Sequence, residues 1–168
     1  SGPGHVHLIN GVYDAHRSHV PLLVIASTVA TTEMGVNYFQ ETNTLKLFDD
    51  CSQYNQMITR SEQVERITHT AIQHAISNRG VSVLGIPGDV FEMEADSKAS
   101  IRKIFHTEPI IRPSDAELLA CADLLNGSSK VTIFCGIGAS EANKEVVLLA
   151  ERLKAPVGYS FRGKMSIQ

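Results

Sequence analysis

The sequence lacks the features that mark several large classes of protein. Residues 20–29 (VPLLVIASTV) form an apolar run about half as long as the roughly 20 residues that span a bilayer, and no run approaches that length. The 15 Lys and Arg residues do not outnumber the 18 Asp and Glu residues, so we expect no nucleic-acid partner. The opening Ser1-Gly2-Pro3-Gly4 has neither the basic start nor the apolar core of a signal peptide.

Cysteine is scarce as well. Cys51, Cys121 and Cys135 are odd in number and widely spaced, and no CxxC pair occurs. This pattern argues against a disulfide framework and against a zinc site, and it favours a reducing cytoplasm. We interpret each cysteine as a small core residue. Seven histidines are present, but no carboxylate completes a recognisable ligand set, so no metal site is predicted.

The chain does contain the alternation of strands and helices that is typical of an α/β fold. Residues 81–90 (VSVLGIPGDV) predict a buried strand that stops at a Pro-Gly-Asp turn. A helix is expected over residues 61–78, capped by Ser61 and ended by Gly80. A short strand at residues 54–58 completes a βαβ unit.

Two stretches of the first half have ligand-binding character. A helix at residues 4–19 that opens just after Gly2-Pro3-Gly4 would direct free backbone N–H groups outward, as an anion or polar ligand requires. Residues 21–27 (PLLVIAS) predict a strand of a parallel sheet, and Tyr38-Phe39-Gln40-Glu41 follows at the sheet edge where ligands bind. The alternatives stay open: a plain turn at the glycines, and a loop in which Phe39 fills the core while its polar neighbours are solvated.

A second α/β unit is expected beyond residues 91–112, which have no clean period and are interpreted as a linker. Ser114 and Glu117 form the pattern of a capping box, and Asn126-Gly127 is the expected helix stop. The side chains expected to face inward from this helix are Leu118, Leu119, Ala122 and Leu125.

Strands at residues 131–135 and 156–160 are expected to flank a second helix at residues 140–154. The turn Gly136-Ile137-Gly138 between strand and helix is a usual position for a nucleotide diphosphate. Glu141 stands where the third glycine of a GxGxxG motif would be, so the motif alone is a weak signal. The predicted fold is therefore α/β, with two partial parallel-sheet units: residues 1–90, a linker at 91–112, and residues 113–168.

In their order along the chain, these features resemble thiamine diphosphate-dependent enzymes. The glycine turn, PLLVIAS, the Tyr38–Glu41 loop and VSVLGIPGDV are similar to the second half of the pyrimidine-binding domain of that family. The chain from Pro113 onward is similar to the start of the central FAD-binding, Rossmann-like domain. HLINGVYDAHRSHVPLLVIA, FQET and Arg162-Gly163-Lys164 resemble the pyruvate oxidases, in particular the pyruvate:quinone oxidoreductases (cytochrome-linked pyruvate dehydrogenases).

The resemblance implies oxidative decarboxylation of pyruvate to acetate and CO2, with thiamine diphosphate and FAD as cofactors and a quinone as electron acceptor. Phe39 and Gln40 would line the pocket over the thiazolium and contact pyruvate, and Gln40 would donate a hydrogen bond to developing charge. The residues expected near the cofactors are Gly2, Pro3 and Gly4 for thiamine diphosphate and Gly136, Ile137, Gly138, Ser160, Phe161 and Arg162 for FAD, with Arg162 able to pair with a phosphate.

The family pattern also includes parts without a counterpart in these residues. Its activating glutamate precedes the glycine turn, and its GDG…N motif, which binds Mg2+ and diphosphate, belongs to a third domain. We therefore expect a fragment of a longer enzyme, inactive in isolation. The whole enzyme is expected to be a cytoplasmic homotetramer, peripheral to the inner face of the membrane through a C-terminal region outside this chain. The alternatives are an acetolactate synthase, which shares the FQE loop, and a non-catalytic module on the same scaffold.

Overall fold

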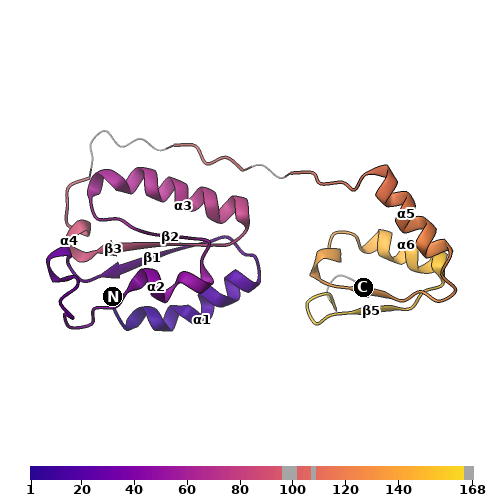
Figure 1. Cartoon of the computed structure of the whole chain (residues 1–168), viewed down its shortest axis with the longest axis horizontal. Helices are drawn as coiled ribbons and strands as arrows, with labels where there is room; N and C mark the ends of the chain where they lie inside the picture. Colours follow the sequence, from indigo (N-terminus) through magenta and orange to yellow (C-terminus); the bar gives the residue numbers. More distant parts are fainter. Residues whose placement is uncertain (96–101, 107–108, 165–168) are drawn as a thin grey trace. The chain divides into compact units, whose positions relative to one another are not determined.

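The computed structural model describes residues 1–95, 102–106 and 109–164 of the chain (Figure 1). Its strands and helices fall into two compact units, Ser1–Pro109 and Ile110–Gln168. Each unit has parallel strands with helices packed beside them, so the predicted α/β class is confirmed.

The first unit is built on a three-stranded parallel sheet in the order β1-β3-β2. β1 spans Leu22–Thr28, β2 spans Tyr54–Met57 and β3 spans Val81–Pro87. All seven residues of β3 are buried, because this strand has a neighbour on either side and helices on both faces. The continuous apolar run that predicted this strand thus reflects its central position.

Helices cover the two faces of this sheet unequally. α1 (Gly4–Arg17) and α2 (Thr44–Leu47) lie on one face, and α3 (Val64–Asn78) lies on the other (Figure 1). A short helix, α4 (Gly88–Phe91), follows β3 directly. The core on the α1 side of the sheet consists of Val12, Val24, Ala26, Phe48, Cys51, Val81 and Val83. The core on the α3 side consists of Ile58, Ala71, Leu84, Ile86 and Val90.

The predicted cap of the long helix is wrong. Ser61–Gln63 form a separate 3-10 turn (η3) and make no side-chain cap, so α3 begins three residues later. The side-chain oxygen of Gln63 accepts a hydrogen bond from the backbone N–H of Thr59 at 2.9 Å. Because Gln63 closes the turn before the helix, a serine cap at residue 61 has no role.

The helix ends at Asn78 as predicted, but Arg79 rather than Gly80 takes the left-handed conformation. Arg79, with φ of 48°, is the left-handed C-cap of α3, and Gly80 follows it. A Cβ on Gly80 would lie 2.3 Å from the side-chain oxygen of Gln53, an exposed side chain that can move aside. The Gly80 N–H donates to the Ala75 carbonyl at 3.0 Å and satisfies the last turn.

Gly11 gives a test of the local stability of α1. It is exposed within the helix, and a Cβ there would meet no atom within 4 Å. Gly11→Ala is therefore expected to raise the free energy of unfolding by roughly 0.5–1 kcal/mol, because alanine loses less backbone entropy in a helix. Chemical denaturation at equilibrium measures this gain. An unchanged or lower midpoint would contradict the exposed helical position of Gly11.

The second unit is a two-stranded parallel sheet with two helices. β4 (Ile133–Cys135) pairs with β5 (Val157–Tyr159), and α5 (Asp115–Asn126) and α6 (Asn143–Leu153) accompany them. The predicted capping box is confirmed, since the Ser114 side chain accepts from the Glu117 N–H and the Glu117 carboxylate accepts from Ser114.

Two predictions for this unit are wrong. The side chains of Leu118 and Leu119 are 43% and 65% exposed, Ala122 is exposed and Leu125 is half-buried. Two strands of three residues each offer too small an apolar face to cover α5. Cys121 on α5 is likewise exposed, whereas Cys51 and Cys135 are buried as expected.

Part of the predicted linker belongs to the first unit. Gln73 on α3 donates to the Phe105 carbonyl at 2.5 Å and accepts from the Phe105 N–H at 3.0 Å. Residues 102–105 of the predicted linker are therefore attached to α3. Residues 96–101 and 107–108 of that linker, and 165–168 of the predicted central-domain part, lie outside the described residues.

Candidate functional site

The carboxyl ends of β1 and β3 meet at one edge of the first sheet, and a long loop starts there. β1 ends at Thr28, and the 3-10 turn η1 (Thr31–Glu33) follows it. Asp89, at the start of α4, accepts hydrogen bonds from the backbone N–H of Thr31 at 2.9 Å and from its hydroxyl at 2.6 Å. The loop of residues 29–43 is thus tied at its beginning to the turn that follows β3.

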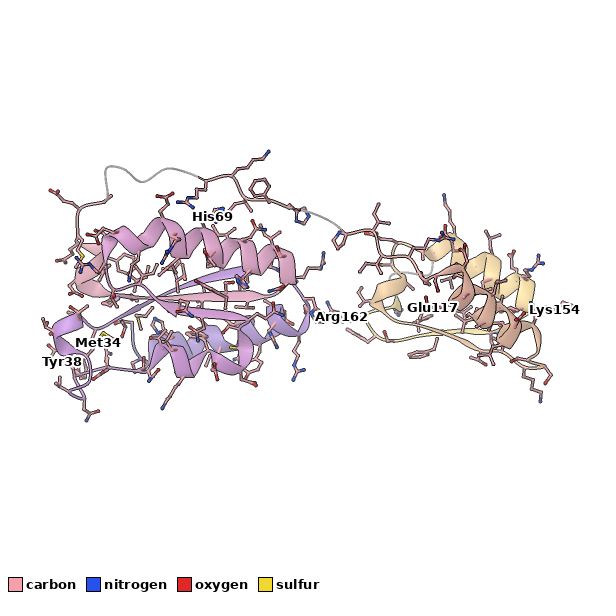
Figure 2. The ribbon with its side chains drawn as sticks, turned by 45° about the horizontal axis from the view of Figure 1, so that its top comes forward. Met34, Tyr38, His69, Glu117, Lys154 and Arg162 are labelled. Carbon is pink, nitrogen blue, oxygen red and sulfur yellow. The ribbon has the colours of Figure 1, made fainter. Side chains whose placement is uncertain are left out.

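The far part of this loop is closed by the carboxylate of Glu41. One oxygen accepts from the backbone N–H of Gly35 at 2.6 Å and the other from that of Tyr38 at 3.1 Å. Three residues here have left-handed backbones: Gly35, Asn37 and Gln40, with φ of 85°, 58° and 62°. Figure 2 shows Met34 and Tyr38 at the outer end of the loop. The carboxylate therefore supports a backbone shape that two of these residue types rarely adopt.

The Gly2 turn and the Gln40 turn are in direct contact. Gly2 is buried with φ of 57°, and a Cβ on it would lie only 2.1 Å from the carbonyl oxygen of Gln40. The structure therefore brings the Gly2 turn against Gln40, whereas the predicted role of these residues at a cofactor stays a prediction. Phe39 is 80% exposed, so the alternative in which it fills the core is wrong.

Unpaired buried polar atoms border the same place. His5 Nδ1, Thr42 Oγ1 and Thr44 Oγ1 have no hydrogen-bond partner in the part of the chain that the structure describes. His5 directly follows Gly4 and Thr42 directly follows Glu41, so these two residues flank the turns that meet. Thr44 instead packs beside Gly85 of β3, and His16 Nδ1 and Asn55 Oδ1 are unpaired buried atoms of the described residues away from both turns. Buried polar groups are normally paired, and such atoms indicate a water or a ligand as the partner.

Sequence reasoning missed His5. Its side chain is only 5% exposed, and its ring centroid lies 6.2 Å from that of Phe48. Burial lowers the pKa of His5, which favours the neutral imidazole. Its position directly after the glycine turn was the available signal.

The residues expected along a second cofactor also lie together, in the second unit. A Cβ on Gly163 would be 2.3 Å from the Cys135 carbonyl oxygen, and the Ser160 N–H donates to that carbonyl at 2.9 Å. The turn of Ser160, Phe161 and Arg162 thus lies beside Gly136, at the carboxyl end of β4. Phe161 is 95% exposed and Arg162 is exposed.

The turn after β4 differs from the predicted direct entry into a helix. Ile137–Ala139 form a 3-10 turn (η4), and α6 begins at Asn143 rather than Ser140. A Cβ on Gly136 or Gly138 would meet no atom within 4 Å, so both glycines border open space. The turn can therefore accept a ligand, but its N–H groups are not those of the α6 N-terminus.

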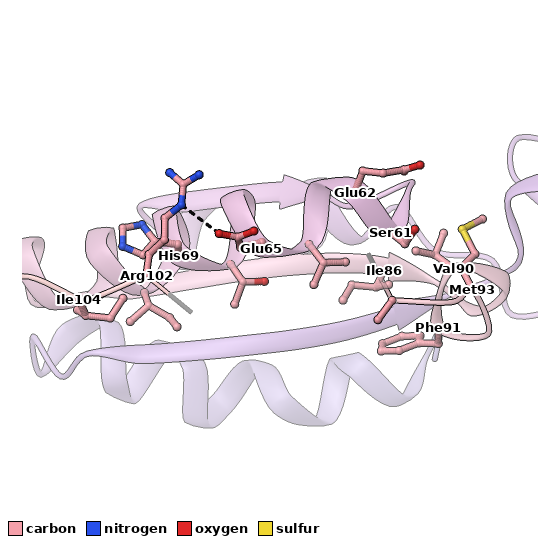
Figure 3. A pocket seen from close by; sticks show the side chains of 14 residues that line it. Ser61, Glu62, Glu65, His69, Ile86, Val90, Phe91, Met93, Arg102 and Ile104 are labelled. Atoms are coloured by element: carbon pink, nitrogen blue, oxygen red, sulfur yellow. Dashed lines mark hydrogen bonds and ion pairs between the residues drawn. The ribbon is translucent and has the colours of Figure 1, made fainter. Parts of the chain in front are cut away.

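A pocket of about 560 Å3 lies on the α3 side of the first unit (Figure 3). Figure 3 shows Glu65, His69 and Arg102 toward one end, and Ile86, Val90, Phe91 and Met93 with Ser61 and Glu62 toward the other. Arg102 Nε pairs with Glu65 at 3.0 Å, and His69 Nε2 lies 3.2 Å from the Lys103 carbonyl oxygen. None of the unpaired buried polar atoms among the described residues lines this pocket. The meeting of the two turns therefore remains the candidate site.

The two loop carboxylates give a pH test of this geometry. The Gly35 N–H, and then that of Tyr38, lowers the pKa of Glu41, and the Thr31 hydroxyl, and then its N–H, lowers the pKa of Asp89. Because the folded pKa lies below the unfolded value of roughly 4, the stability they contribute is complete above that value. This contribution to the free energy of unfolding is lost as the pH falls through the pKa of each carboxyl group in the folded protein.

The expected result is that the Thr31 and Gly35 amide resonances move only at pH values below the ordinary carboxyl range. A nuclear magnetic resonance titration from pH 7 to 2 measures these midpoints. Midpoints at or above the ordinary Asp and Glu values would contradict both sets of hydrogen bonds.

Two negative findings apply to the described ranges. No helix there is both long and apolar enough to cross a membrane. No group of three His, Cys, Asp or Glu side chains there is placed to hold a metal ion.

Comparison with known proteins extends these observations. Residues 1–64 match the family description "Thiamine pyrophosphate enzyme, N-terminal TPP binding domain". Residues 118–168 match "Thiamine pyrophosphate enzyme, central domain". Thiamine pyrophosphate is another name for thiamine diphosphate.

Individual relatives cover nearly the whole chain. It is 44% identical over 168 residues to an uncharacterized 42.6 kDa protein of Pseudomonas amyloderamosa, with 99% of this chain and 42% of that protein covered. It is 30% identical over 166 residues to a pyruvate oxidase of Lactiplantibacillus plantarum, covering 98% and 28%. It is 27% identical over 171 residues to an acetolactate synthase of Arthrospira platensis, covering 98% and 29%. The chain thus spans less than half the length of these relatives.

Proposed function

Because the chain belongs to the family of thiamine pyrophosphate enzymes, we propose that it is part of an enzyme that oxidatively decarboxylates pyruvate. The reaction converts pyruvate, water and a quinone to acetate, CO2 and the quinol, with thiamine diphosphate and FAD as cofactors. The observation that carries the proposal is the contact of the Gly2 turn with Gln40. The 30% identity to a pyruvate oxidase supports pyruvate as the substrate.

The residues at the first site fit a thiamine cofactor. The unpaired His5 Nδ1 and Thr42 Oγ1 border the place where the two turns meet, as expected for a polar ligand. Gly2, Pro3 and Gly4 would hold the cofactor, since a turn without a Cβ at Gly2 allows close approach of backbone. Bound thiamine diphosphate supplies the nucleophilic carbon and accepts the electron pair that decarboxylation leaves.

The side chains of the loop would then act on the substrate. Phe39, 80% exposed beside the glycine turn, would exclude water from the reacting atoms. Gln40 would orient pyruvate and donate an amide hydrogen bond to the oxygen on which negative charge develops. Its left-handed backbone places it at the tip of the turn that touches Gly2.

The residues of the second unit fit a flavin nucleotide. Gly136, Ile137 and Gly138 border open space that a diphosphate requires, and the adjoining Ser160, Phe161 and Arg162 extend that surface. The Arg162 guanidinium would pair with a phosphate, and the exposed Phe161 ring would pack against an aromatic part of the cofactor. FAD would supply the two-electron acceptor between pyruvate and the quinone.

Related proposals concern the whole enzyme. We propose a cytoplasmic homotetramer that contacts the inner face of the membrane, with Mg2+ held by residues outside this chain. The 168 residues alone are expected to show no turnover. The principal alternative is an acetolactate synthase, supported by the 27% identical relative of that name. A non-catalytic module on the same scaffold is the alternative from another class.

Product analysis distinguishes these functions. The full open reading frame that contains these residues is expressed, loaded with thiamine diphosphate, Mg2+ and FAD, and given 13C-labelled pyruvate with a soluble quinone. One acetate, one CO2 and one quinol per pyruvate are expected. Labelled acetolactate without quinone reduction would overturn the oxidase in favour of the synthase. Tight cofactor binding without consumption of pyruvate would favour the non-catalytic module.

A further inference from the structure

We propose that Glu41 and Asp89 are positioning residues, which hold the loop of residues 29–43 so that Phe39 and Gln40 meet the Gly2 turn. Neither carboxylate is expected to touch the substrate or the cofactor. The predicted loss of kcat rests on the proposed function. The predicted loosening of the loop rests on the hydrogen bonds alone.

Glu41 acts on the end of the loop that carries Gln40. Its two oxygens accept N–H groups from Gly35 and Tyr38, and its own N–H donates to the Tyr38 carbonyl at 2.9 Å. These bonds close a turn whose last residue before Glu41 is the left-handed Gln40. A glutamine side chain cannot accept from both N–H groups with two oxygens, because one of its terminal atoms is a donor.

Asp89 acts on the beginning of the loop. Its two oxygens accept the N–H and the hydroxyl of Thr31, which lies 58 residues away in the sequence. Asp89 itself belongs to α4, which follows the buried strand β3 without a connecting loop. Asp89 therefore links the beginning of the loop to the central strand of the sheet, in addition to the pairing of β1 with β3.

The other support of the loop is also polar, since the Tyr38 hydroxyl donates a hydrogen bond to the Glu33 carboxylate. Apart from Glu33, every residue from Thr31 to Gln40 is exposed. Such a segment buries little apolar surface, so its shape depends on hydrogen bonds rather than on core packing. Two carboxylates at its two ends, with the Gly2 contact between them, are suited to keep a catalytic amide in one place.

The test uses Glu41→Gln and Asp89→Asn in the full-length enzyme, with Glu62→Gln as the matched control. Glu62 is an exposed carboxylate paired with Arg60 at 3.4 Å, and it takes no part in the hydrogen bonds of Glu41 and Asp89 with the loop. Each loop variant is expected to lower kcat with pyruvate by about 10- to 100-fold, since small displacements of a catalytic group are costly. KM and the affinity for thiamine diphosphate are expected to change by less than about twofold. The melting temperature is expected to change by no more than a few degrees.

Amide hydrogen exchange of the peptide that contains residues 31–41 gives a readout without turnover. Faster exchange in both loop variants, and not in Glu62→Gln, is expected. Unchanged exchange would overturn the proposal, as would a parallel loss of cofactor affinity and melting temperature with kcat. If the wild type turns over no 2-oxo acid while exchange still rises in the variants, the proposed function fails but the positioning of the loop stands.

Discussion

Gly2→Ala in the full-length enzyme is expected to lower kcat/KM for pyruvate by about 100-fold or more, because no side chain fits at this position. The added Cβ would lie 2.1 Å from the Gln40 carbonyl oxygen and 2.9 Å from Gln40 Cβ. The φ of 57° adds backbone strain for any residue with a Cβ. Either the glycine turn or the loop must move, and both are parts of the proposed thiamine site.

The control for this prediction is Gly11→Ala, in the helix α1 that follows the Gly2 turn. It adds the same methyl group where no atom lies within 4 Å, so activity is expected to stay unchanged. Steady-state kinetics of both variants, with thiamine diphosphate affinity measured in parallel, makes the comparison. If Gly2→Ala is as active as Gly11→Ala, the contact between the glycine turn and Gln40 does not form the site.

Gly163→Ala is expected to remove most of the bound FAD. Its Cβ would lie 2.3 Å from the Cys135 carbonyl oxygen and 3.2 Å from the Gly136 carbonyl carbon, both backbone atoms. The turn of Ser160, Phe161 and Arg162 would have to separate from the end of β4. We expect the dissociation constant for FAD to rise by about 100-fold because one face of the site is lost. This rise corresponds to roughly 3 kcal/mol of binding free energy.

Gly158→Ala is the matched control within the same unit. Its Cβ would touch only the Phe134 ring at 3.4 Å, and that side chain is 73% exposed and can move. Flavin absorbance after gel filtration measures retained FAD in both variants. Equal flavin content would contradict the assignment of the Gly136 and Ser160 turns to one cofactor.

The parts of the fold that depend on local sequence could be predicted. β3 was visible as a continuous apolar run because it is buried on both faces. The start of α5 was visible because a capping box needs only Ser114 and Glu117, three residues apart. The ordered motifs also predicted that Gly2-Pro3-Gly4 and Phe39-Gln40 serve one site, and the structure shows Gly2 against Gln40 while the role of the site stays a prediction.

The remaining features depend on partners that sequence spacing does not reveal. Asp89 and Thr31 are far apart in the chain, so their hydrogen bonds follow from the pairing of β1 with β3. The exposure of Leu119 was misjudged because a helical apolar pattern does not report how much sheet lies beneath the helix. The late start of α6 was missed because a 3-10 turn and a first helical turn need similar residues.

The central claim is that these residues belong to an enzyme that holds thiamine diphosphate and FAD. Native mass spectrometry of the protein purified from its own source cells tests it most directly. We predict a subunit much larger than 18.3 kDa, assembled as a tetramer, with one thiamine diphosphate and one FAD released per subunit on denaturation. A folded assembly that carries neither cofactor, and takes up neither on incubation with Mg2+, would contradict the account.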